Sequence, residues 1–162
     1  MTLIKAFVVS FALFLPATLF AQGFDVAFGS LQGDSEMPVE VSADSLSVNQ
    51  NDGSAVFNGN VIISQGTMRM TAPVVNVFYN PDTKGIARLV ATGGVLLVQD
   101  QDAAESDEAD YDLENEIIVM TGSVLLSQGA NTMNSDKMTV HIAKGTANME
   151  GRVKTIMRTG DN

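Results

Sequence analysis

The chain has no cysteine and no tryptophan, and His141 is its single histidine. Without cysteine the protein can form no disulfide and can offer neither a thiol nucleophile nor a cysteine for lipid attachment. One histidine excludes a histidine-rich metal centre, and no Gly-rich phosphate loop followed by a helix is predicted. The sequence therefore contains no catalytic constellation, and we expect neither an enzyme nor a bound metal or cofactor.

Basic residues are also scarce, because 9 Lys and Arg stand against 19 Asp and Glu, for a formal net charge of −10. Binding to phosphates requires a surplus of Lys and Arg, so we expect no nucleic-acid partner. Nine of the acidic residues lie within 100–116, in a spacing that only loosely resembles a calcium-binding loop and lacks its glycine. A solvated acidic face is the main interpretation, and binding of divalent cations is the alternative.

The long apolar run of this sequence lies at the start of the chain, where Lys5 precedes a mostly apolar segment over residues 6–20. This pattern is typical of a signal peptide, predicted over residues 1–21 with cleavage after Ala21. Leu19 is larger than this kind of cleavage site prefers, so an uncleaved anchor is the alternative. Residues 22–37 are rich in glycine and polar side chains and predict a flexible leader, and residues 158–162 predict a frayed C-terminus.

What the rest of the chain contains is a repeat. The pattern Gly-x-Val begins at residues 59, 93, 122 and 151, at spacings of 34, 29 and 29. A second pattern (a small residue, Asp or, in the second copy, Pro, then alternating apolar positions) begins at residues 43, 72, 106 and 135, at spacings of 29, 34 and 29. One five-residue insertion near 81–85 accounts for the longer spacing. Such a period predicts a stack of four copies of one supersecondary unit, each of about 29 residues.

Each repeat predicts a pair or trio of short antiparallel strands. Counting outward from each glycine in steps of two gives mostly apolar residues, and the positions beside the glycine are mostly polar. A glycine at the same place in every strand predicts a bend where the sheet folds over. The fold class is therefore all-β, an open antiparallel β-jelly roll or V-shaped trough, with residues 39–41 and 152–155 as unpaired edge strands.

Two segments of this pattern, residues 56–66 and 119–129, resemble the signature of the OstA-like domain family, and residues 38–44 resemble its first strand. The resemblance covers residues 38–157. It implies a periplasmic lipopolysaccharide carrier whose apolar groove holds lipid A acyl chains. It also implies head-to-tail stacking that bridges the inner and outer membranes for outer-membrane assembly. The implied partners are lipopolysaccharide, further copies of the chain, and the OstA-like domains of inner-membrane C-type and outer-membrane D-type components. This chain is more acidic than such a carrier leads us to expect, and it lacks a long basic C-terminal tail.

The resemblance implies ligand-facing positions at Val39, Val41, Leu97, Tyr111 and Leu113, and the strand periodicity independently places Leu97 and Tyr111 inside. Together with the recurring apolar positions, the predicted lipid-binding residues are Val39, Val41, Leu46, Phe57, Val61, Ile63, Leu97, Tyr111, Leu113, Met120, Leu126 and Met138.

Nine methionines favour a lining that accepts flexible apolar ligands, although methionine also simply fills core gaps. Two alternatives therefore stay open from the sequence: a structural β-solenoid filled by its own side chains, and a membrane-associated C-type component of the same system.

Overall fold

The computed structural model describes residues 24–29, 36–49 and 53–158. The predicted signal peptide, residues 1–21, lies outside this part of the chain, as does all but the first residue of the predicted frayed end, residues 158–162. The described residues form eleven strands and a short 3₁₀ helix, Ile142–Lys144. No helix in this part of the chain is long and apolar enough to cross a membrane.

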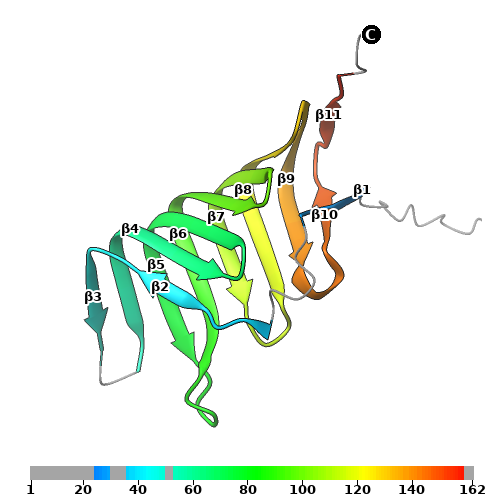
Figure 1. Cartoon of the computed structure of the whole chain (residues 1–162). Helices are drawn as coiled ribbons and strands as arrows, with labels where there is room; N and C mark the ends of the chain where they lie inside the picture. Colours follow the sequence, from blue (N-terminus) through cyan, green and yellow to red (C-terminus); the bar gives the residue numbers. More distant parts are fainter. Residues whose placement is uncertain (1–23, 30–35, 50–52, 159–162) are drawn as a thin grey trace, which may run out of the picture.

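All the strands belong to one antiparallel sheet, which curves along its length and stays open (Figure 1). Its order is β1-β10-β9-β8-β7-β6-β5-β4-β2, with β3 paired to β4 and β11 paired to β9. The predicted all-β class and open antiparallel architecture are confirmed. The strand bounds are β1 Phe24–Ala27, β2 Glu40–Ser42, β3 Ser45–Val48, β4 Ala55–Gln65, β5 Met68–Tyr79, β6 Ile86–Gln99, β7 Asp102–Asp112, β8 Ile117–Gln128, β9 Asn131–His141, β10 Thr146–Glu150 and β11 Lys154–Ile156.

The sheet bends at the four glycines that mark the period. Gly59, Gly93, Gly122 and Gly151 have φ angles between 77° and 91°, a region that glycine adopts readily because it has no Cβ. The ladder register shifts at the same places, for example between Asn58 and Val61 in the β4–β5 pair. The predicted bend at each glycine is therefore confirmed.

The bends divide the sheet into two walls. The first wall contains β1, β3 and β10, and the second wall contains β2 and β11. Each of the six long strands, β4 to β9, contributes one half to each wall. The apolar core lies between the walls, because inward-facing residues alternate with outward-facing ones along every strand.

One sequence prediction needs correction. Residues 22–37 do not form a loose leader throughout, since β1 pairs with β10 from Phe24↔Met149 to Ala27↔Thr146. Phe28 follows β1 and is fully buried in the core. A short stretch with strand alternation and one large apolar side chain gains enough from pairing and burial to offset the entropy of ordering it.

The predicted edge strands are partly right. β2 and β11 lie at the two ends of the second wall, close to the predicted segments 39–41 and 152–155. The ends of the first wall are β3 and β1, and neither was predicted as an edge. β1 precedes the first repeat in the sequence and yet covers the last one.

Candidate functional site

The candidate site is the apolar interior between the two walls, which is built from rows of residues paired across the sheet. Side chains of directly paired residues lie on the same face, so a row of pairs forms a continuous strip. The row next to the bends in the first wall is Leu46, Phe57, Val75, Ala91, Ala109, Met120, Met138 and Met149. The row nearer its rim is Val48, Ala55, Val77, Leu89, Tyr111, Ile118, Val140, Ala147 and Val26.

The second wall supplies a matching strip. Its row is Val41, Ile63, Met70, Leu97, Ala104, Leu126, Met133 and Thr155. Between β4 and β9 none of the three rows contains a charged side chain. Ala91 and Ala109 are paired in the first wall and Ala104 lies on β7 in the second wall, so small side chains occur on both walls at the middle of the interior, beside the large ring of Tyr111.

The structure brings eleven of the twelve predicted lining residues to this interior. Seven are at most 1% exposed: Val61, Ile63, Leu97, Tyr111, Met120, Leu126 and Met138. Four are partly buried and pack against the core: Val39, Val41, Phe57 and Leu113. Leu46 is the exception, because it is 53% exposed on β3. Its pairing with Phe57 places it on the inner face, but none of the described strands lies beyond β3 to cover it.

A polar band lies where the second wall meets the rim of the trough. Glutamines end three strands of this wall: Gln65 on β4, Gln99 on β6 and Gln128 on β8. Gln99 Nε2 donates to Thr67 Oγ1 at 2.6 Å, and Gln65 Nε2 donates to the Met37 carbonyl at 3.0 Å. The glutamines therefore satisfy backbone and side-chain groups at the edge of an otherwise apolar interior.

Tyr111 joins the two walls. Its ring is buried in the first wall, and its hydroxyl donates a hydrogen bond to Gln65 Oε1 of the second wall. Burial raises the pKa of Tyr111 to about 12, and the Glu116 carboxylate adds to this shift. The hydroxyl consequently stays protonated, and able to donate, to a higher pH than an ordinary tyrosine.

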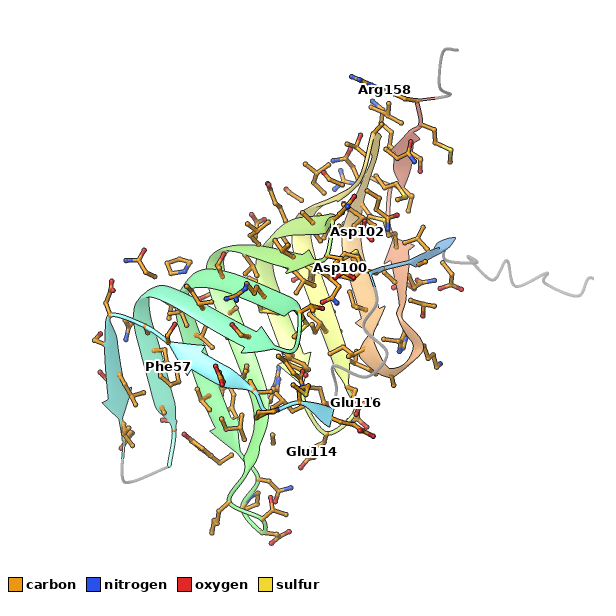
Figure 2. The ribbon with its side chains drawn as sticks, in the orientation of Figure 1. Phe57, Asp100, Asp102, Glu114, Glu116 and Arg158 are labelled. Atoms are coloured by element: carbon orange, nitrogen blue, oxygen red, sulfur yellow. The ribbon has the colours of Figure 1, made fainter. Side chains whose placement is uncertain are left out.

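The acidic run of residues 100–116 extends along β7 from one rim to the other. Asp100 and Asp102 lie at one margin and Glu114 and Glu116 at the opposite one (Figure 2). Asp110 faces outward and pairs with Arg88, as the predicted strand alternation requires. Within the described ranges, no group of three or more His, Cys, Asp or Glu side chains could hold a metal ion.

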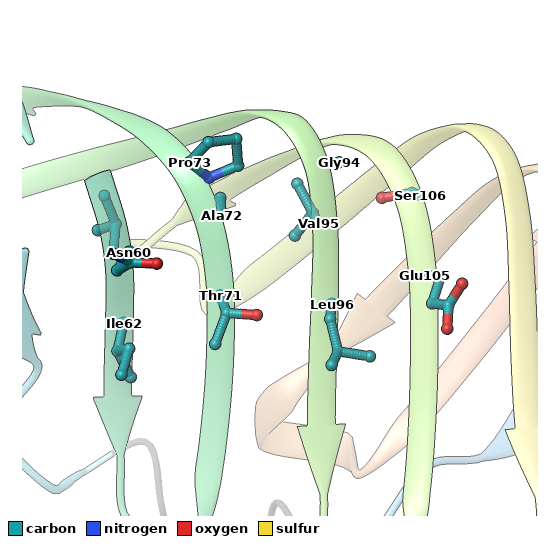
Figure 3. A pocket seen from close by; sticks show the side chains of 11 residues that line it. Asn60, Ile62, Thr71, Ala72, Pro73, Gly94, Val95, Leu96, Glu105 and Ser106 are labelled. Atoms are coloured by element: carbon teal, nitrogen blue, oxygen red, sulfur yellow. The ribbon is translucent and has the colours of Figure 1, made fainter. Parts of the chain in front are cut away.

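The outer face carries a shallow hollow of about 610 Å³ beside the second bend (Figure 3). Ile62, Thr71, Leu96 and Glu105 form a row across it, on the opposite face of the sheet from the interior rows. Pro73 and Gly94 close its end at the bend. This hollow mixes polar and apolar groups and lies on the solvent side of the sheet.

Sequence reasoning missed two contributions to the site. The glutamines at 65, 99 and 128 are spaced by 34 and 29 residues, the same spacing as the first three bend glycines, so the period could have revealed them. Phe28 was missed because it stands alone in a segment whose composition favours a flexible leader.

Comparison with known proteins agrees with this architecture. Residues 40–146, more than half of the chain, match the family described as LptA/(LptD N-terminal domain) LPS transport protein. An uncharacterized protein of Rhizobium meliloti is 29% identical over 145 residues, which are 83% of this chain and 78% of that protein. Lipopolysaccharide export system protein LptA of Escherichia coli K12 is 28% identical over 116 residues, 68% of this chain and 63% of that protein.

Lipopolysaccharide export system protein LptH of Pseudomonas aeruginosa is 26% identical over 130 residues, covering 72% of this chain and 73% of LptH. The crystal structure of LptH, described as the LptA homologous periplasmic component of the lipopolysaccharide transport device, superposes with a TM-score of 0.67 at 20% identity. That superposition covers 77% of this chain and 98% of the LptH chain, so the two share a fold. The chain belongs to the LptA/LptD N-terminal-domain family of lipopolysaccharide transport proteins.

Proposed function

We propose that this protein is a periplasmic lipopolysaccharide carrier of an Lpt export system and has no catalytic activity. Its interior shields lipid A acyl chains while the glycolipid moves towards the outer membrane. The observation that carries the proposal is the set of three uncharged rows that line the interior from β4 to β9. Acyl chains bind such a surface through buried apolar area, at roughly 25 cal/mol per Å².

For lipid to enter the interior, the two walls must separate. The interior side chains are nearly all 0–1% exposed, so acyl chains and the protein's own side chains cannot occupy the space together. The alanines on β6 and β7 leave little side-chain volume to displace at their own positions. Methionines in the first-wall row, Met120, Met138 and Met149, can adopt new rotamers around a flexible chain.

The same tight packing favours one alternative, a structural β-solenoid whose interior never opens. The two functions differ in whether lipid ever contacts the inward-facing residues.

Adjacent leucines on two strands provide a matched test. Leu97 and Leu126 face the interior and are fully buried, whereas their neighbours Leu96 and Leu125 lie on the outer face. A photo-crosslinking residue placed in cells at 97 or 126 should form adducts with lipopolysaccharide, and one at 96 or 125 should not. Equal labelling at both positions would contradict the assignment of the interior. Labelling at neither, together with no lipopolysaccharide in native mass spectra of the purified protein, would support the solenoid.

The proposal also includes head-to-tail assembly. Strands lie about 4.8 Å apart, so the described sheet is roughly 40 Å long, too short for one copy to span a periplasm. The two ends of the sheet differ, so a contact between them is heterologous and extends into an open filament. We expect the ends to contact further copies and the OstA-like domains of C-type and D-type membrane components. Sedimentation at increasing protein concentration measures the self-association.

A further inference from the structure

β1 occupies the last edge of the first wall. It pairs with β10 in antiparallel register, with Val26 opposite Ala147 and Asp25 opposite Asn148. Val26 lies at the end of the rim-side row, packed against the core. At the other end of the same row stands Val48 of β3, which is 62% exposed.

β1 and β3 also run in the same direction. β3 passes from the bend towards the rim, because Ser45 pairs with Asn58 near the bend and Val48 pairs with Ala55. β1 does the same on β10, from Phe24 opposite Met149 to Ala27 opposite Thr146. A second copy that continued the antiparallel sheet would place its β3 on β10 in this direction and in the rim-side row. β1 therefore takes the place that β3 of the next copy would take.

The two arrangements exclude each other. If β3 of a second copy added to the outer edge of β1, the two strands would be parallel, and the alternation of directions that runs from β4 to β10 would break at the junction. The second wall is not affected, because among the described strands β11 pairs with β9 alone, and its outer edge can accept β2 of the next copy.

Contacts of the last residue of β1 and of the two residues after it hold this strand in place. Phe28 is buried in the core, and its N–H donates to the Gly145 carbonyl of the first wall at 3.2 Å. The Gly29 N–H donates to the Asp102 carboxylate of the second wall at 3.0 Å. Gln128 Nε2 donates to the Ala27 carbonyl at 2.7 Å and to Asp102 at 2.8 Å. In Figure 2, Asp102 lies beside β1 at this rim.

We propose that β1 is an internal cap on the β10 edge of the trough. β1 must leave β10 before a second copy can stack there. The inference rests on the proposed head-to-tail assembly and adds a regulation to it. An edge strand of four residues opens far more easily than the strands of the core. A cap closed about 90% of the time would raise the apparent dissociation constant for stacking about tenfold.

A reversible disulfide tests the cap. Asp25 is exposed, Asn148 opposite it is half-buried, and their side chains are hydrogen-bonded at 2.9 Å. Paired Cα atoms of antiparallel strands lie about 4.5–5.5 Å apart, within the range that a disulfide spans. Because the chain has no cysteine, Asp25→Cys/Asn148→Cys introduces the only thiols. The oxidised protein should remain monomeric over concentrations at which its reduced form assembles, and Asp25→Ser/Asn148→Ser serves as the unlinked control.

A second variant opens the cap. Gly29 has a φ angle of 54°, and a Cβ added there would lie 2.9 Å from Gln99 Cβ, so Gly29→Ala should release β1. This variant should assemble at about tenfold lower concentration than the unmodified protein in sedimentation. Equal assembly of the oxidised and reduced forms would overturn the cap and leave stacking intact. Monomers in every form, Gly29→Ala included, would instead contradict head-to-tail assembly itself.

Discussion

At three of the four bends an aspartate side chain packs against the bend glycine, whereas at the second bend Pro73 takes that place. Cβ atoms added at Gly59, Gly122 and Gly151 would each lie within 3.0 Å of the Cβ of Asp44, Asp107 or Asp136, respectively. The backbone N–H groups of Asp44 and Asp136 donate to the carbonyls of their glycines at 2.9 Å. Pro73 has no N–H to donate, so the second bend lacks this hydrogen bond.

The residue after the glycine differs as well. Asn60, Ser123 and Arg152 follow the other bend glycines at φ angles of 45° to 49°, and Asn60 and Arg152 hydrogen-bond to the aspartate of their own bend. At the second bend Gly94 follows Gly93. Gly94 has a φ angle of 97°, and no atom lies within 4 Å of the position that a Cβ would take there. The second bend is thus held by the fewest contacts, and we expect the walls to separate most readily there. The bond between Tyr111 on β7 and Gln65 on β4 spans this place, because β5 and β6 lie between those strands.

The largest effect is predicted for a substitution that disrupts one of the bends held by an aspartate. Gly122→Ala forces a residue with a side chain to a φ angle of 79° and brings its Cβ to 2.8 Å from Asp107 Cβ, so unfolding should require about 3 kcal/mol less free energy. Gly94→Ala meets no neighbour and should cost only the backbone strain, about 1–2 kcal/mol. Urea denaturation of both variants measures the difference, and equal losses would contradict the contrast between the bends.

The next effect concerns the bond across the second bend. Tyr111→Phe removes a buried hydrogen bond between the walls and should lower the free energy of unfolding by about 1 kcal/mol. Because the pKa of Tyr111 is raised to about 12 from an ordinary value of 10.0, the neutral hydroxyl stabilises the fold fully below pH 10. This contribution is lost as pH rises towards 12. Denaturation between pH 9 and 12 should therefore show a loss in the unmodified protein that Tyr111→Phe lacks.

A smaller change would make the second bend resemble the others. Pro73→Asp restores the N–H that can donate to Gly93 and the carboxylate found at the other bends. The gained hydrogen bond and the lost rigidity of proline in the unfolded chain oppose each other, so the free energy of unfolding should change by less than about 1 kcal/mol. Hydrogen exchange of residues 91–98 should become slower. Unchanged exchange would show that Pro73 does not loosen this bend.

The smallest effect is expected at the last bend. Arg152 pairs with Asp136 at 2.5 Å and, by donating to it, lowers the pKa of that carboxyl, but the arginine side chain is 87% exposed. Exposed ion pairs are screened by salt and add little to stability. Arg152→Ala should leave thermal unfolding at 0.5 M salt unchanged, and the glycine contact of Asp136 should persist. A marked loss of stability would mean that the ion pair, and not the glycine contact, holds this bend.

The sequence predicted the repeated parts of this fold well. The spacing of Gly59, Gly93, Gly122 and Gly151 located the bends, and strand alternation placed Leu97 and Tyr111 inside, because both signals recur in every unit. Features that occur once were missed. β1 is a four-residue strand in a Gly-rich leader, and its pairing with β10 joins residues 119 to 125 apart in sequence, a contact that no local pattern reveals. The exposure of Leu46 follows from its place on the edge strand, and the alternation that places it on the inner face carries no information about how many strands lie beyond it.

Each aspartate or proline at a bend meets a glycine from its own repeat: 44 with 59, 73 with 93, 107 with 122 and 136 with 151. The side chain that packs against each bend glycine is therefore supplied from within the same repeat. The length of the trough can consequently vary, since a whole unit of 29 residues can be duplicated or removed with its bend complete. Each added unit contributes two strands and extends the trough by about 10 Å, so the number of repeats sets the length of the trough.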